Sequence, residues 1–161
     1  MKKIDPGQVI TILANVGVIA GIAFLAIEIN QSNQLARSQT RSDISERLVG
    51  FTHLLASDAE LYELYSRGRQ EPDSLTEVER GRLFTLWGGI LRTWENIHYQ
   101  YRNGLFDDSE FLVEREVWRM QTQSPFFVEL YCQVREQLSR EFTAEIDSLM
   151  SSSDCAESAV P

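Results

Sequence analysis

Histidine and cysteine, which supply many metal ligands and catalytic groups in proteins, are scarce in this sequence. The 161-residue chain contains two residues of each type. It also lacks a glycine-rich phosphate-binding loop, and no serine or cysteine has a plausible general base nearby in the sequence. These absences predict a non-enzymatic protein with no catalytic residue, no metal site and no cofactor.

An excess of basic residues is also missing, because the net charge is −9 at pH 7. Nucleic-acid binding requires a basic face that pairs with phosphates, so this charge argues against nucleic acid as a partner. The same charge argues against a surface that lies on anionic lipid. Attachment to a membrane would therefore depend on an apolar segment.

The two cysteines, Cys132 and Cys155, lie far apart in the sequence, one in a helical pattern and one in the C-terminal tail. Disulfide-stabilised secreted domains normally contain more cysteines than this. A mobile tail would also not hold the geometry that a disulfide requires. We therefore predict two free thiols, which favours a reducing compartment.

Charged residues are absent from Val9 to Ile27, where Thr11 and Asn15 are the only polar side chains. A helix needs roughly 20 such residues to cross the hydrocarbon core of a bilayer. The run is longer than the core of a secretory signal, which has about 7–15 residues. We predict an N-terminal flank at residues 1–8 and an uncleaved transmembrane helix at residues 9–28, with membrane lipid as a partner.

Glycine and proline are nearly absent from residues 29–57, where Gly50 is the one exception. Apolar residues recur there at steps of four and three, which is the spacing of one helix face: Ile44, Leu48, Phe51 and Leu55. The transmembrane helix is therefore expected to continue as an amphipathic stalk helix.

Residues 58–150 have helical patterns without the alternation of a strand. A capping box at Thr76–Glu79 begins one helix and Asn103-Gly104 ends it. A final helix is predicted from Pro125 to about Met150, before a disordered tail at residues 151–161. The predicted fold is all-α, with one N-terminal transmembrane helix that continues into a long stalk helix and packs with a small helical bundle.

Four residues of the apolar run form a candidate helix–helix interface: Ala14, Asn15, Gly17 and Gly21. The two glycines have the spacing that lets membrane helices approach closely, and the Asn15 amide would seek a partner across an interface. Alternatively, the glycines reflect the general abundance of glycine in membrane helices, and headgroup water satisfies Asn15. A pore is a further alternative, with Asn15 in its lumen and Glu28 at its mouth.

Aromatic residues form a second candidate site. Trp87, Trp94 and Tyr101 recur every seven residues and share one helix face, and Trp118 follows on the next predicted helix. These rings are expected to form either the core or a groove for a partner helix or an apolar ligand.

Two other patterns favour structural roles. Glu95-x-x-His98 has the helical spacing of di-iron bundles but occurs once, so His98 is expected to be a core or interface ring and not a ligand. Five acidic residues gather at a predicted helix start, where they favour the positive end of the helix dipole: Asp107, Asp108, Glu110, Glu114 and Glu116.

The chain resembles a group of uncharacterised bacterial single-span membrane proteins. The likeness rests on GxIAGIxFLAxxIxQxxxxxR, here Gly17 to Arg37, on LTxxER, here Leu75 to Arg80, and on WENIHYQYRNGLFDD, here Trp94 to Asp108. It implies a membrane-anchored helical protein and brings no activity, cofactor or catalytic residue with it. Basic residues often follow the span soon after its end in this group, whereas here the first one is Arg37.

Basic residues flank the predicted span almost evenly, with Lys2 and Lys3 before it and Arg37, Arg41 and Arg47 after it. The nearness of the lysines favours a domain outside the cytoplasm. The resemblance and the predicted free thiols favour a cytoplasmic domain, which is the orientation we predict, in the bacterial inner (cytoplasmic) membrane.

The function predicted from these features is that of an assembly subunit or scaffold. It would form a homo-oligomer through its span or join other membrane-protein subunits as an accessory subunit. Two alternatives remain at this point: a homo-oligomeric channel or transporter component, and a membrane-tethered ligand sensor or enzyme.

Overall fold

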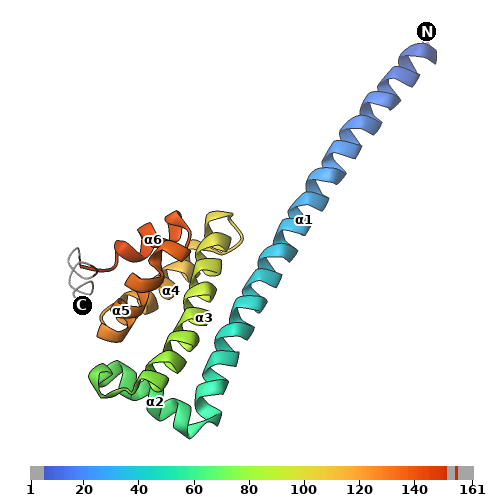
Figure 1. Ribbon diagram of the computed structural model, residues 1–161. Helices are drawn as coiled ribbons and strands as arrows, with labels where there is room; N and C mark the ends of the chain where they lie inside the picture. The colour runs from blue at the N-terminus through green and yellow to red at the C-terminus, as the bar shows by residue number, and fades with distance from the viewer. Residues whose placement is uncertain (1–5, 152–154, 156–161) are drawn as a thin grey trace. The chain divides into compact units, whose positions relative to one another are not determined.

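The computed structural model describes residues 6–151 and Cys155, and these residues form helices and connecting turns with no strand among them (Figure 1). This confirms the predicted all-α fold. The chain divides into two compact units, residues 1–39 and 40–161, which we describe separately. The elements are α1 (Pro6–Ser57), α2 (Ala59–Gln70), η1 (Pro72–Ser74), α3 (Glu77–Arg102), α4 (Asp108–Gln121), α5 (Pro125–Val134), η2 (Arg135–Gln137) and α6 (Arg140–Asp147).

The first helix runs without interruption through the apolar run and the predicted stalk. Its last turns belong to the second unit, where Ile44 is buried and Leu48 packs against the core. Phe51 meets the edge of Tyr65 on α2, with 6.1 Å between the ring centroids. The predicted amphipathic face therefore contributes to the core of the second unit.

Local sequence signals fix the ends of α2 and α3. Asp58 accepts a hydrogen bond from the Leu61 amide at 2.9 Å and so caps α2. Thr76 and Glu79 form the predicted capping box, in which each side chain accepts the other residue's backbone N–H. The Thr76 backbone bond and the Arg67 guanidinium lower the pKa of Glu79 to about 2. Gly104 follows α3 at φ +71°, a conformation that favours glycine.

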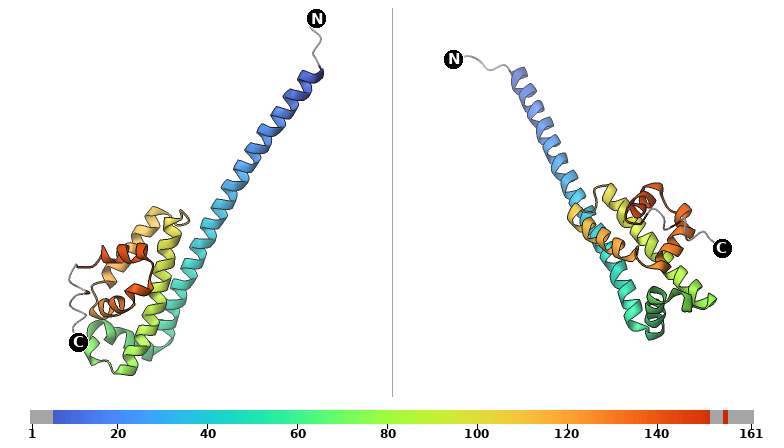
Figure 2. Two further views of the ribbon diagram at one scale, coloured as in Figure 1. Left: turned by 45° about the horizontal axis from the view of Figure 1, so that its top comes forward. Right: turned by 90° about the vertical axis from the view of Figure 1, so that its left-hand side faces the viewer.

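The third helix lies at the centre of the second unit, where α2, α4, α5 and α6 all contact it (Figure 2). Its inner face buries Leu83, Trp87, Leu91, Trp94, Ile97 and His98. Gly68 of α2 approaches this face so closely that a Cβ atom there would collide with the Leu83 side chain. A small residue is therefore needed where α2 crosses α3.

Aromatic rings dominate the core. Trp94 stacks on Trp118 of α4 with centroids 5.4 Å apart and lies 5.5 Å from Phe127 of α5. Trp118 in turn meets the edge of Phe142 on α6 at 5.8 Å. Large rings that each bury about 150–250 Å² thus connect helices that are distant in sequence.

The predicted final helix over residues 125–150 is wrong, because the chain breaks between α5 and α6. Leu138 is extended at φ −103° and ψ 160°, and Ser139 is the N-cap residue of α6. Two side chains of α3 bind the backbone that this break frees. Arg92 donates to the Gln137 carbonyl at 3.0 Å, and Glu95 accepts the Ser139 N–H at 2.7 Å. The break in the helix therefore depends on tertiary hydrogen bonds, which the helical periodicity of the sequence does not predict.

Replacement of Trp94 by alanine should lower the free energy of unfolding by about 3–5 kcal/mol, because its ring is 3% exposed and joins three helices. Chemical denaturation of the full chain in detergent, followed by circular dichroism, measures this loss. Leu112→Ala is the control, since Leu112 is 62% exposed and its removal should change stability by less than about 0.5 kcal/mol. Equal denaturation midpoints for Trp94→Ala and the wild type would contradict the assignment.

Candidate functional site

The apolar stretch of α1 is the most distinctive surface of the first unit. Its large apolar side chains, from Val9 to Ile29, are between 40% and 68% exposed. They point to all sides of the helix, and none of the stretch is buried in the structure. The helix is long and apolar enough to cross a membrane.

The glycine spacing defines one side of this helix. With 3.6 residues per turn, Ala14, Gly17 and Gly21 fall within about 60° of one another. A Cβ atom added to either glycine would meet no atom within 4 Å, so this side is open for a close approach. It is the side of α1 on which another helix could pack most closely.

Asn15 lies elsewhere on the helix. It is turned by about 100–160° from the three small residues, so a helix that packs on the glycines leaves the Asn15 amide on another side. Glu28 lies about 20° from Gly21 and about 140° from Asn15. A single lumen-facing line along α1 therefore does not hold both Asn15 and Glu28, which is the arrangement that a pore would use.

The structure places the aromatic set of the second unit mainly in the core. Trp87, Trp94 and Trp118 are at most 3% exposed. Tyr101 is half-buried and stacks on Phe111 at 3.8 Å. These rings pack against one another and are therefore part of the core.

His98 lies in the same core, between rings of α4 and α6. Its ring centroid is 6.0 Å from that of Phe111 and 5.9 Å from that of Phe142. Burial lowers the pKa of His98, so the neutral ring is favoured in the folded protein. Among the residues that the structure describes, no three His, Cys, Asp or Glu side chains are placed to hold a metal ion.

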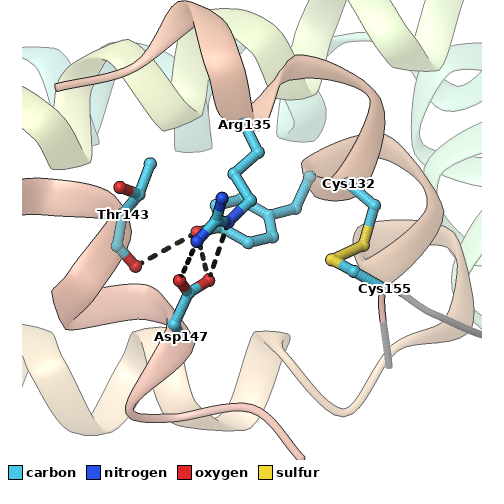
Figure 3. Close-up of a disulfide and its surroundings, with 6 residues drawn as sticks. Cys132, Arg135, Thr143, Asp147 and Cys155 are labelled. Atoms are coloured by element: carbon cyan, nitrogen blue, oxygen red, sulfur yellow. Dashed lines mark hydrogen bonds and ion pairs between the residues drawn. A yellow bond between two sulfur atoms is a disulfide. The ribbon is translucent and has the colours of Figure 1, made fainter. Parts of the chain in front are cut away.

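A polar network of Tyr131, Arg135 and Asp147 joins the buried hydroxyl-bearing ring of Tyr131 to a partly exposed ion pair at the C-terminal end of the bundle (Figure 3). The Tyr131 hydroxyl lies 2.7 Å from Asp147 Oδ1 and 3.2 Å from the Thr143 carbonyl. Arg135 donates to both oxygens of Asp147. The guanidinium of Arg135 keeps the pKa of Asp147 below its usual value, and burial raises the pKa of Tyr131. This network ties α6 to α5 after the break between them.

A disulfide joins Cys132 to Cys155 beside this network, so the prediction of two free thiols is wrong (Figure 3). The chain turns back after α6, and Leu149 and Met150 pack against the core. This turn brings the two Cα atoms within 5.4 Å of each other, which is the ordinary separation for a disulfide. The remainder of the predicted disordered tail, residues 152–154 and 156–161, lies outside the described residues. An even pair of cysteines was the only sequence signal for this bond.

The acidic residues near the start of α4 separate into different environments. Asp107 is the N-cap residue of α4 but makes no capping hydrogen bond through its side chain. Asp108 raises the pKa of Tyr101, Glu110 pairs with Arg41 at 2.8 Å, and Glu116 pairs with Arg119. Glu114 is half-buried and has no hydrogen-bond or ion-pair partner among the described residues.

Comparisons with known proteins add no relative to this description. No protein-family model matches the chain, and neither a curated protein nor a solved structure is significantly similar to it.

Removal of the disulfide should lower the free energy of unfolding by about 3 kcal/mol, since it closes a loop with a sequence separation of 23 residues. The double variant Cys132→Ala/Cys155→Ala tests this loss by chemical denaturation with and without reductant. Reductant should destabilise the wild type and leave the double variant unchanged. Two reactive thiols in the denatured, unreduced wild-type protein would refute the bond.

Proposed function

We propose that this chain is a single-span protein of the bacterial inner membrane that acts as an assembly subunit. The observation that carries the proposal is the exposed apolar stretch of α1. Burial of apolar surface is favourable by about 25 cal/mol per Å², so a helix that is apolar on every side is stable only in lipid or among other helices. About 20 residues of this kind match the thickness of a bilayer.

The continuity of α1 supports an anchor and not a cleaved secretory signal. The residues that follow Ala26 are Ile27, Glu28 and Ile29, and they continue the helix without a break. A signal cleavage site needs small residues at this point. The span and the folded domain therefore remain parts of one polypeptide in this proposal.

The two sides of the span support assembly with more than one neighbour. Ala14, Gly17 and Gly21 offer a close-packing surface on one side. The amide of Asn15, on another side, lies in hydrocarbon and gains from a hydrogen bond to a second helix. This combination suits a small oligomer or a place between subunits of a larger complex better than an isolated anchor.

The disulfide changes the favoured orientation of the domain. Disulfides persist in oxidising compartments, and free thiols were one of the two reasons to expect a cytoplasmic domain. Lys2 and Lys3 precede the span closely, whereas its other end has no basic residue before Arg37. Both observations favour a cytoplasmic N-terminus and a helical domain on the oxidising, outer side of the membrane.

Replacement of Gly17 and Gly21 by leucine should reduce the mass of the native particle, because the larger side chains prevent close helix packing. Mass analysis of the intact particle after extraction in mild detergent measures its copies and components. Ala23→Leu is the matched control, since it places the same side chain about 120–180° away from the small residues and about 80° from Asn15 on the helix. An unchanged particle in the glycine variant would rule out this surface as the contact.

A membrane-impermeant amine reagent should label the N-terminal flank of the protein only in permeabilised spheroplasts. Lys2 and Lys3 are the only lysines in the sequence, so the reagent reports one side of the span. The variant Lys2→Arg/Lys3→Arg gives the background and keeps the charges that direct insertion. Labelling of the two lysines in intact spheroplasts would show that the domain lies in the cytoplasm.

A further inference from the structure

An open groove with a volume of about 260 Å³ lies in the second unit, between the last turns of α1 and the beginning of α4. Four of its nine lining residues are apolar: Ile44, Leu48, Phe106 and Val113. Ile44 and Phe106 are buried core residues, whereas Val113 is 65% exposed. The floor of the groove therefore consists of core residues, and its edge is accessible to solvent.

The charged residues that line this groove include one more carboxylate than cation. Arg41 and Glu110 lie in its lining and neutralise each other through an ion pair of 2.8 Å. Arg115, the basic residue next to Glu114 in the sequence, pairs with Glu145. Glu114 lines the groove and has no cationic partner among the described residues. One half-buried carboxylate is therefore left without compensation.

This carboxylate selects the charge of a ligand. Burial raises the pKa of Glu114, because the ionised form loses hydration without gaining a counter-charge. A cation in the groove supplies that counter-charge, an anion increases the cost, and an uncharged molecule supplies no counter-charge. The hydroxyls of Ser45 and Ser109 also line the groove and can accept further hydrogen bonds from a donor.

We propose that this groove is a binding site for a small organic amine. The ammonium group donates to Glu114 and to the serine hydroxyls, and a short aliphatic or aromatic body lies against Leu48 and Val113. The volume is slightly below the range of about 300–1,000 Å³ that is usual for ligand pockets, which suits a body of this size. The site is independent of the proposed assembly through α1, since all of its residues belong to the second unit.

A direct test titrates the full chain in non-ionic detergent with 4-fluorobenzylamine and follows binding by ¹⁹F NMR. Protein-free micelles correct for partition into detergent. 4-Fluorobenzyl alcohol has the same body without the charge, and 4-fluorobenzoate has the opposite charge. Saturable binding of the amine, with the alcohol roughly ten-fold or more weaker and no binding of the benzoate, is the expected result.

Two variants locate the site. Glu114→Gln should weaken amine binding by roughly ten-fold or more, while Glu116→Gln, an exposed position on the same helix outside the groove, should leave it unchanged. Val113→Trp should occupy the groove and block binding without disturbing the core, because Val113 is largely exposed. Equal binding of the amine and the alcohol, binding that persists in Glu114→Gln, or an absence of saturable binding would each overturn the proposal.

Discussion

Trp94 occupies the point where three helices of the second unit meet. Its ring touches Trp87 on its own helix, Trp118 on α4 and Phe127 on α5. The positions of α4 and α5 on α3 therefore depend on one side chain and the rings that it contacts. Phe142 extends the same contact to α6 through Trp118. Short helices of 8 to 14 residues, which would be marginal alone, gain their stability from this shared cluster.

Polar contacts then select how the helices connect around this cluster. The Arg80–Glu129 and Arg115–Glu145 pairs join separate helices, but partly exposed pairs of this kind contribute only about 0–1 kcal/mol each. Glu95 is more consequential, because it holds the backbone of Ser139 where the chain leaves the helical conformation. Burial opposes its ionisation, yet the Ser139 N–H and Arg92 keep its pKa below the usual value. The carboxylate of Glu95 thus stays charged and accepts the Ser139 N–H, which has no helical partner at the break between α5 and α6.

Elements that depend on contacts between residues close in sequence were predicted correctly, whereas elements that depend on distant residues were not. Both ends of α3 are predictable because the Thr76–Glu79 capping box and the Gly104 turn are contacts between residues close in sequence. The break at Leu138 depends on Arg92 and Glu95, which lie more than 40 residues earlier in the chain. The helical periodicity of residues 125–150 therefore does not predict this break. The disulfide was missed for the same reason, because the turn after α6 that approaches Cys132 is a tertiary feature. The groove and the isolated charge of Glu114 likewise arise only when α1 and α4 are placed side by side.

The proposed membrane anchor would lower the affinity that contacts between subunits require. Attachment to one bilayer holds subunits at a high effective concentration, so contacts that are weak in solution can suffice for assembly. In the proposed assembly, the glycine side of α1 would associate through close packing, because no hydrophobic force acts between helices in lipid. In the proposed orientation, the acidic domain also lies on the side where its disulfide is stable and where repulsion from anionic cytoplasmic lipid does not act. An organic cation in the groove of the same domain would compensate the charge of Glu114 and leave the span unaffected, because all residues of the groove belong to the second unit.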